Sequence, residues 1–555
     1  YFHQTPVGTG IQRVVSETVG AIVNGDTELA DVEIVYFDKT GIWKIIPKPA
    51  LRKLLAKASK AGDDWKTKYP KMVRSWAKGE TAKFKNSDTL YYLGAPTSNH
   101  GMIEALLTME NERPRCVYYV HDVIPIKFPE LFKEEHVSAF TTWLFQLNTV
   151  AQGIICNSEA TRRDFLEVTG YAGPSSTVNL AIAPPILASE PKASRVEILS
   201  ELKLMDAPFV LMVGTVEPRK NHVIAFRVWQ ALQRRLGDDC PVLVVVGALG
   251  WNTQNILADF DAVNSAGRIV LAGAQNDETL TVLYHHCQFT VYLSNYEGWG
   301  LPITESLAFG KACVCGNNSS LPEAAQGLAF LVNHKDQTEI EEQIATLVEN
   351  PDLLSAQEAK IIRERTFKSW TDFYLELRTI ESELPQDGKQ AVAAVTPNVT
   401  YTFGHEERTG PHGQRVSGAS FRVGKGWYAA EDWGCWSSSK SSRIQCKFQE
   451  AGQYEVYLHI KVPGAGAHLT LAGPNGVIWE GFVQKSRVLS GTLDVLSANE
   501  AVELSIVTTS VSPYPSRKRA QRDWNLSVGW IALHCAKGPI RKSTSTVLKD
   551  MLRTA

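Results

Sequence analysis

The residues best suited to chemistry lie between positions 294 and 305, where an apolar run gives way to a glycine-rich turn. Residues 294–300 read Ser-Asn-Tyr-Glu-Gly-Trp-Gly, and a helical pattern begins near Pro302. Glycines allow backbone N–H groups to approach a ligand, and the first turn of a helix adds unpaired N–H groups with a partial positive charge of about half a unit. The pattern therefore predicts a seat for a diphosphate.

Two glutamates flank this turn, Glu297 within it and Glu305 in the helix that follows. Two such residues are most often solvated side chains on a helix surface. On either side of a phosphate seat, however, their oxygens could accept hydrogen bonds from both ends of a nucleotide-sugar. Glu297 would then face hydroxyls of the sugar, and Glu305 would face hydroxyls of the ribose.

A second group follows the apolar run 209–213, where residues 214–221 read Gly-Thr-Val-Glu-Pro-Arg-Lys-Asn. Its adjacent cations, Arg219 and Lys220, stand at the carboxyl end of a strand, where open α/β sheets bind ligands. They could neutralise the charge that develops on a leaving diphosphate. The alternative is a surface pair at the start of a helix, which the helix dipole disfavours. We therefore expect an anion to bind here.

A third group is His121 and Asp122, which follow the apolar run 115–119. Strand ends of the first domain should point into a cleft between domains. A single histidine is often structural, but one beside an aspartate at a strand end favours a role in proton transfer or substrate binding. Residues 157–163 repeat the pattern of polar side chains directly after a strand.

The elements that must position these groups are short apolar runs separated by helical patterns, as in parallel sheets covered by helices on both faces. We expect strands at 32–36, 89–93, 115–119 and 153–156, and again at 209–213, 242–246, 269–271, 289–293 and 312–315. The fold class is therefore α/β, with two Rossmann-like domains facing a cleft. We assign residues 1–183 to the first domain and 184–383 to the second.

The C-terminal part has a different hydrophobic pattern. The helical period disappears, and short runs of alternating apolar and polar residues appear between turn residues. This pattern is typical of an antiparallel β-sandwich. We assign 384–398 to a linker, 399–537 to the sandwich and 538–555 to a tail. Its residues 426–437 hold Trp427, Trp433 and Trp436. Their rings could stack on sugars in a glycan-binding site, or they could form the core of the sandwich.

Composition excludes several classes of protein. The 555 residues carry a formal net charge of -2 and are 44% hydrophobic, which excludes a globally basic nucleic-acid binder and an acidic disordered chain. No apolar run reaches the roughly 18 residues that span a bilayer. The nine cysteines are scattered through apolar runs, which indicates buried thiols in a reducing cytosol. Cys313 and Cys315 lie two residues apart, but no second pair stands at the spacing of a zinc site, so we expect no metal.

The chain begins at Tyr1 with a glycine loop at residues 8–10 and no complete strand before it, so we expect further sequence upstream. Residues 50–85 hold eleven Lys or Arg and three acids, an excess of eight positive charges, with apolar residues interleaved. Such a segment could lie on an anionic membrane, or it could be a solvated helical insertion.

Over residues 1–380, and in family order, the chain resembles the retaining family-4 glycosyltransferases of GT-B fold. The spacing from Glu297 to Glu305 resembles their E-x7-E signature, and residues 214–221 resemble the G-T-x-E-P-R-K-N variant frequent in bacterial mannosyltransferases of O-antigen and capsule assembly. Further similarities lie in the first-domain glycine loop, in two segments that follow strands and in a helix that crosses back to the first domain: residues 9–13, 156–165, 317–323 and 365–377.

The resemblance implies a role for each matching residue. Arg219 and Lys220 would clamp the donor diphosphate, Glu297 would hold the donor sugar, and His121 would help to organise the transition state. Asp122 would lie on the acceptor side. The expected donor-binding residues are Gly8, Thr9, Gly10, Gly273, Ser294, Gly298, Trp299, Gly300 and Glu305. Many relatives carry an arginine earlier in the second-domain loop, where this chain has Gly214-Thr215, so Arg219 must supply that charge.

The resemblance further implies retaining transfer of a sugar from a nucleotide-diphospho-sugar, with GDP-mannose the favoured donor. No cofactor or metal is expected, because cations and a helix dipole would neutralise the leaving group. The expected partners are the donor, a glycan or lipid-linked glycan acceptor and other polysaccharide-assembly enzymes, with no nucleic acid. We expect a cytoplasmic protein on the inner face of the membrane.

Two other enzyme classes and one non-enzyme stay open at this point. A phosphorylase or nucleotide-sugar hydrolase of the same fold would use a similar cleft, although no pyridoxal-binding lysine can be identified. A two-carboxylate glycosidase would leave the glycine turn and the Arg219-Lys220 pair without a role. The non-enzyme alternative is a degenerate scaffold that binds glycan through the sandwich.

Overall fold

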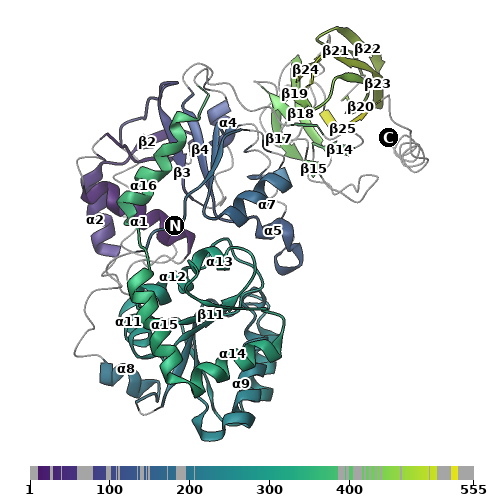
Figure 1. Cartoon of the computed structure of the whole chain (residues 1–555). Coiled ribbons are helices and arrows are strands. Elements are labelled where there is room, and N and C mark those ends of the chain that lie inside the picture. Colours follow the sequence, from purple (N-terminus) through teal and green to yellow (C-terminus); the bar gives the residue numbers. More distant parts are fainter. Residues whose placement is uncertain are drawn as a thin grey trace, which may run out of the picture.

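The computed structural model describes residues 10–535 with gaps, the longest at 59–78, 95–101, 183–194, 386–393, 404–415 and 509–526 and the others one to three residues long. Figure 1 shows two α/β domains, one above the other, with a β-rich domain beside the upper one. The predicted GT-B arrangement with an added β domain is therefore present.

The first α/β domain is built on a parallel sheet in the order β3-β4-β5-β6. These strands are β3 (Thr89–Tyr92), β4 (Arg115–Val120), β5 (Gly153–Cys156) and β6 (Ser175–Thr177). The strand expected at 32–36 does not join this sheet. Instead β1 (Val35–Phe37) pairs antiparallel with β2 (Trp43–Ile45). The prediction was wrong there because an apolar run alone does not specify its partner strand.

The second α/β domain has six parallel strands in the order β12-β11-β10-β7-β8-β9. They are β7 (Phe209–Val213), β8 (Val242–Val246), β9 (Ile269–Gly273), β10 (Thr290–Tyr292), β11 (Cys313–Gly316) and β12 (Phe330–Val332). Phe209 and Leu211 pack into one core, and Val210 and Met212 into another. Both faces of the sheet are therefore covered, which is why its strands read as continuous apolar runs.

Helices cover these faces, and one later helix returns to the first domain. The core that holds Val210 also holds residues of α9 (His222–Leu236) and α14 (Gln337–Glu349), and α8 (Arg195–Glu201) and α11 (Asp277–His286) line the other. After α15 (Pro351–Glu364), the helix α16 (Trp370–Arg378) lies among the first-domain elements in Figure 1. There Phe373 contacts Tyr119 of β4. The expected return of the chain to the first domain is thus observed.

The helix α1 (Ile11–Asn24) begins directly after Gly10, whose φ of 53° is readily adopted by glycine. The first-domain helix α7 (Glu159–Thr169) starts just after β5, and α12 (Leu301–Ala308) follows β10 after the glycine turn. All three helices begin at carboxyl ends of strands or at the interdomain surface. Their N-terminal turns therefore border the region where the two α/β domains meet.

The C-terminal domain contains two sheets whose inward side chains share one core. The strands of one sheet are β13 (Ala394–Val395), β16 (Arg422–Val423), β19 (Ser441–Phe448), β21 (Ala467–Gly473), β22 (Gly476–Val483) and β24 (Glu500–Thr508). Those of the other are β14 (Val399–Thr402), β15 (Val416–Ser417), β17 (Trp427–Glu431), β18 (Gly434–Ser437), β20 (Gly452–Lys461), β23 (Ser486–Val495) and β25 (Ser527–Cys535). The strand β13 lies inside the segment expected to be a linker.

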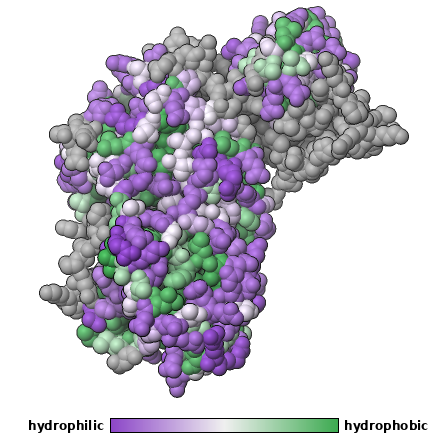
Figure 2. All heavy atoms as spheres, viewed as in Figure 1, coloured by the Kyte–Doolittle hydropathy of each residue, from purple (hydrophilic) through white to green (hydrophobic). Residues whose placement is uncertain are grey.

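The surface of the described part is mainly hydrophilic on the face drawn in Figure 2, with smaller apolar areas over the second α/β domain. No described helix has the length and apolar character needed to cross a membrane. The eight cysteines with described side chains are all buried free thiols, as predicted, and burial raises the pKa of Cys116 to about 12.

Candidate active site

The cations Arg219 and Lys220 lie in a short 3-10 turn, Pro218–Lys220, which follows β7 and precedes α9. The next residue, Asn221, has a left-handed backbone with φ of 61°. Its Nδ2 donates hydrogen bonds to the carbonyl oxygens of Leu293 and His334, at 3.1 and 2.8 Å. These bonds fix the cationic turn against the segment that follows β10. The groups at 214–221 and 294–305 are thereby brought together.

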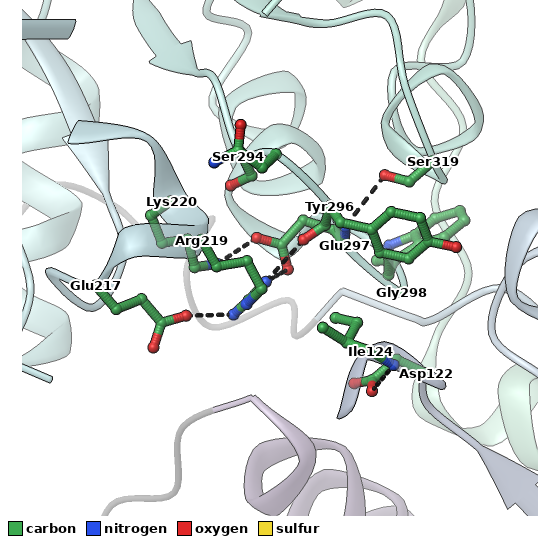
Figure 3. A network of polar contacts seen from close by, with 12 residues as sticks. Asp122, Ile124, Glu217, Arg219, Lys220, Ser294, Tyr296, Glu297, Gly298 and Ser319 are labelled. Atoms are coloured by element: carbon green, nitrogen blue, oxygen red, sulfur yellow. Dashed lines mark hydrogen bonds and ion pairs between the residues drawn. The ribbon is translucent and has the colours of Figure 1, made fainter. Parts of the chain in front are cut away.

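The carboxylate of Glu297 is the centre of a buried ionic cluster. Its Oε1 lies 2.6 Å from Lys220 Nζ and its Oε2 lies 2.6 Å from Arg219 Nη1. Arg219 Nη2 reaches Glu217 Oε1 at 2.6 Å, and Figure 3 shows the guanidinium between the two carboxylates. Tyr292 donates from its hydroxyl to Glu297 Oε1 at 3.0 Å. Two cations and two carboxylates therefore balance each other before any ligand arrives.

Burial and charge act in opposite directions on these groups. Burial would raise the pKa of Glu297, but the charges of Lys220 and Arg219 outweigh it and lower that pKa to about 2. Burial lowers the pKa of Lys220, and the negative charge of Glu297, which raises that pKa, offsets the effect only in part. For Glu217, burial raises the pKa despite the neighbouring Arg219. Glu297 is thus held as an ionised acceptor for hydroxyl groups.

The glycine turn after Glu297 touches the first domain directly. A Cβ atom on Gly298 would lie 1.9 Å from the carbonyl oxygen of His121, so no larger residue fits here. Ser158 Oγ donates to the carbonyl oxygen of Gly298 at 2.8 Å. Gly300 has φ of 136°, which L side chains rarely adopt, and it caps the start of α12. Both glycines are therefore required by geometry.

His121 and Asp122 lie on the first-domain side of this contact. His121 is buried, and because a carbonyl can only accept, its Nε2–H donates to Leu93 O at 2.8 Å. Burial lowers the pKa of His121 to about 4, so the imidazole is neutral near pH 7 with Nδ1 as an acceptor. Asp122 accepts from the backbone N–H of Ile124, and burial raises the pKa of its carboxyl.

Glu305 lies at the other end of the site, on α12. Its Oε1 is 2.9 Å from Nη1 of Arg13 in the first domain, and its Oε2 accepts from the hydroxyl of Tyr284 at 2.9 Å. Like the turn beside Glu297, this carboxylate faces first-domain residues. The two glutamates thus border the same interdomain surface.

The remaining expected site residues divide into three groups. Ser294 and Trp299 are buried, and Trp299 packs in the core shared by the two α/β domains. Gly10 and Gly273 have positive φ at the start of α1 and the end of β9. Gly8, Thr9 and Trp433 lie outside the described residues, as do the side chains of Trp427 and Trp436. Glycan binding by the sandwich therefore stays a prediction.

Several residues of the site were not singled out in the sequence. Glu217 orients Arg219, and the hydroxyls of Ser319 and Ser320 hold the backbone of Glu297 from the loop before α13 (Leu321–Ala324). Arg13 holds Glu305. The signal for Glu217 was its place two residues before Arg219 in the motif, but only the fold shows that it faces that guanidinium.

A second carboxylate links the two domains. Glu323, near the start of α13, accepts hydrogen bonds from the backbone N–H groups of Glu159 and Ala160, at 2.7 and 2.9 Å. These N–H groups begin the first-domain helix α7, where helix geometry leaves donors unsatisfied and favours negative charge. We call this contact the Glu323 cap. Ser158 of the same segment donates from its Oγ to the carbonyl oxygen of Gly298, so the residues after β5 join the two domains through both backbone and side-chain groups.

The basic segment 50–85 is described in part. Within α2 (Lys48–Ala58), Leu51 and Leu54 pack with Val23 and Ile46 in a small core. The apolar side chains of this helix are therefore already covered by protein. Residues 59–78, which carry much of the positive charge, lie outside the described residues.

Metal ligands were not expected, and the described residues contain no group of three or more His, Cys, Asp or Glu that could hold an ion. Residues 259–261 read Asp-Phe-Asp, a pair of carboxylates of the kind that can bind a metal, but they lie in the helix α10 (Gln254–Val263). There Asp259 pairs with Arg227 at 3.0 Å on the surface. A mechanism without metal remains a prediction.

Comparison with known proteins assigns the second α/β domain. Residues 196–366 match the family described as "Glycosyl transferases group 1". The O-antigen chain mannosyltransferase B of Escherichia coli is 27% identical over 257 residues, which cover 46% of this chain and 67% of that protein. The serotype-specific mannosyltransferase WbdA of Escherichia coli is 23% identical over 260 residues, 46% of this chain and 31% of that one. The chain thus spans about a third of the length of WbdA.

Similar solved structures include the lipopolysaccharide glycosyltransferase WaaG, with a TM-score of 0.44, 13% identity and coverage of 67% of this chain and 96% of that one. The sucrose-phosphate synthase of Thermosynechococcus elongatus has a TM-score of 0.45 at 16% identity, covering 69% and 97% of the two chains. The predicted family and enzyme class are confirmed by the sequence matches at the level of one domain. Residues 196–366 form a group 1 glycosyl transferase domain, and this chain is a homologue of O-antigen mannosyltransferases.

Proposed function

We propose that the chain is a retaining glycosyltransferase that moves a mannosyl unit from GDP-mannose onto a growing O-antigen or capsule polysaccharide. The observation that carries this proposal is the buried cluster of Glu297 with Arg219 and Lys220, beside a glycine turn pressed against His121. The mannosyl group is favoured because the relatives reported above are named as mannosyltransferases.

The cluster suits departure of a diphosphate. In the absence of donor, Glu297 holds both cations in place, so they need no rearrangement when negative charge develops on the leaving group. A donor sugar whose hydroxyls bind Glu297 would bring its phosphates beside the same cations and the first turn of α12. These groups can supply the charge stabilisation on their own, so the reaction is proposed to need no metal ion.

The first domain completes the site from the opposite side. The neutral His121 presents an acceptor nitrogen, and Asp122 lies across from Arg219 in the close-up view. An acceptor hydroxyl that approaches from this side would meet the sugar on the same face as the leaving phosphate. That geometry suits transfer with retention, through a transition state with positive charge on the sugar.

The acceptor is proposed to be a lipid-linked glycan at the inner face of the membrane. The excess of eight positive charges in 50–85 supports this location through attraction to anionic lipid, at about 1 kcal/mol per cation near the surface. Since Leu51 and Leu54 are buried in protein, electrostatics and not insertion of α2 would provide the binding. Sedimentation with anionic liposomes should fall with added salt, and unchanged binding at high salt would contradict this location.

The proposal is tested by incubating the chain with GDP-mannose, UDP-glucose, UDP-N-acetylglucosamine or dTDP-rhamnose and a mannose-terminated lipid-linked acceptor. We expect product from GDP-mannose alone, an α-linkage by NMR, and the same rate after treatment with EDTA. Product from another donor would correct the sugar, a β-linkage in the product from GDP-mannose would contradict retention, and loss of activity in EDTA would contradict the metal-free step. Glycan binding with no product from any donor would favour a non-catalytic scaffold.

A further inference from the structure

Arg13 connects the first domain to the end of the site that holds Glu305. It lies in the first turn of α1, and its Nη1 is 2.9 Å from Glu305 Oε1 on α12. Both side chains are largely buried, with 22% and 11% of their surface exposed. This ion pair joins residues 292 positions apart, and it takes no part in the cluster around Glu297.

The position of Arg13 needs an explanation, because a cation in the first turn of a helix is disfavoured by the helix dipole. No acidic residue in the first turn of α1 offsets it. The charge is offset instead by a carboxylate from the other α/β domain. A residue placed at such a cost to its own helix is expected to serve the contact that it makes.

The contacts of Glu305 leave it able to bind a diol. Arg13 donates to Oε1 and the hydroxyl of Tyr284 donates to Oε2, so each oxygen has one partner and a fixed direction. A carboxylate oxygen can accept a second hydrogen bond. Adjacent hydroxyls of a ribose could therefore occupy the two remaining sites.

The charges around Glu305 come from three elements. Asp277 at the start of α11 and Glu17 on α1 are both coupled to this site, and burial raises the pKa of Glu305 and of Glu17. Arg13 on α1 and Tyr284 on α11 act in the opposite direction on Glu305. Removal of Arg13 would leave burial and Asp277 to raise the pKa of Glu305 further. The protonated acid would then be a weaker acceptor for hydroxyl groups.

A small hollow lies beside this ion pair. It holds about 10 Å³ and is lined by Arg13, Glu305 and Leu301, together with Ile182, at the end of the first domain, and Trp370 of α16. Both α/β domains and the returning helix thus contribute walls. The hollow is far smaller than the roughly 300–1,000 Å³ of a complete ligand pocket, so it marks where these elements meet at the ion pair and is not a preformed nucleotide pocket.

We propose that Arg13 is a positioning residue for nucleotide recognition, which orients the Glu305 carboxylate toward the ribose hydroxyls of the donor. Recognition of the ribose then depends on contact between the two α/β domains, since neither supplies both residues. This inference rests on the proposed function, in which a nucleotide-sugar binds with its ribose at Glu305.

The test is calorimetric titration with GDP and UDP, each beside its 2′,3′-dideoxy form. The wild-type chain should bind one ribonucleotide more tightly than its dideoxy form. Arg13→Met should weaken binding of that ribonucleotide by roughly tenfold, as expected for a lost charge-assisted hydrogen bond, with little effect on the dideoxy form. Arg13→Lys, which keeps the charge, should restore part of the difference.

A pH series adds a second readout. In Arg13→Met, the affinity for the ribonucleotide should begin to fall at a higher pH than in the wild type, because Glu305 becomes protonated earlier. The matched control is Arg227→Met, which removes another interhelical Arg–carboxylate pair, with Asp259, on the surface of the second domain. This variant should bind both forms as the wild type does.

The outcomes separate the two claims. Failure of the wild-type chain to bind any nucleoside diphosphate would overturn the proposed function. Tight wild-type binding, with equal losses for the ribonucleotide and the dideoxy form in Arg13→Met, would overturn the inference alone, because a purely structural role weakens both forms equally. An unshifted pH profile in a folded Arg13→Met variant would also overturn it.

Discussion

The two glutamates of the site are held in different ways. Glu297 is bound by Arg219 and Lys220 of the same domain. The two cations follow β7 and the carboxylate follows β10, and these strands are neighbours in the sheet. Glu305 is bound by Tyr284 of its own domain and by Arg13 of the other. One end of the site is therefore assembled within a single α/β domain, whereas the other is complete only when the two domains meet.

This difference suggests a division of work. A preorganised cluster suits a step in which developing charge must be stabilised without rearrangement of the protein, as in departure of a diphosphate. A carboxylate completed across an interface suits recognition, because binding at that point favours the closed arrangement of the domains. Variants within the Glu297 cluster, at the domain interface and at its periphery test this division.

The largest effect is expected at the cluster itself. Lys220→Ala should lower the rate of sugar transfer by roughly 100-fold or more, because it removes a preorganised cation from the leaving group. It also leaves part of the Glu297 charge unpaired, so the thermal midpoint should be measured beside the rate. Glu297→Gln in the same background should recover stability but not transfer, and recovery of transfer by the double variant would contradict the assigned roles.

The next effect is expected at the Glu323 cap. Glu323→Gln should lower kcat/KM by about tenfold, since two hydrogen bonds from α7 to a charged acceptor are weakened and the domains close less readily. In the presence of donor, small-angle scattering should show a larger radius of gyration for Glu323→Gln than for the wild type. Glu349→Gln, which alters an exposed pair with Arg235, is the control and should change neither quantity. Equal compaction of Glu323→Gln and wild type would argue against the cap.

A smaller effect is expected from Glu217, which touches Arg219 but not the donor. Glu217→Gln should keep a hydrogen bond to the guanidinium while removing a charge, so kcat should fall a few-fold with KM nearly unchanged. Glu217→Ala should cost more, because the guanidinium loses its partner. If both variants lowered kcat equally, orientation of Arg219 would not be the function of this carboxylate.

The smallest effect concerns stability and pH. Burial lowers the pKa of His121 to about 4 in the folded protein, from the 6.5 of an exposed histidine, so the unfolded chain binds this proton more readily. The wild type should therefore lose stability relative to His121→Gln as pH falls from about 6.5 to 4, and the difference in stability should stop changing with pH above about 7. Urea unfolding at several pH values measures this, and parallel curves would show that burial of the imidazole has no such cost.

Much of the fold could be predicted because buried parallel strands are continuous apolar runs with turn residues after them. The strands at 209–213, 242–246 and 153–156 have the bounds expected from that pattern. The residues 32–36 show its limit, since β1 pairs with β2 in a hairpin and not with the parallel sheet. Pairing depends on which strand lies alongside, and a local run carries no information about that.

The site shows the same division. The sequence by itself determined the glycine turn, the adjacent cations and the spacing of Glu297 and Glu305, because each depends on neighbours a few residues away. Only the tertiary structure decided that Glu217 would hold Arg219, that Glu323 would cap α7 and that Arg13 would meet Glu305. These contacts join distant segments through burial and charge compensation, which no local pattern specifies.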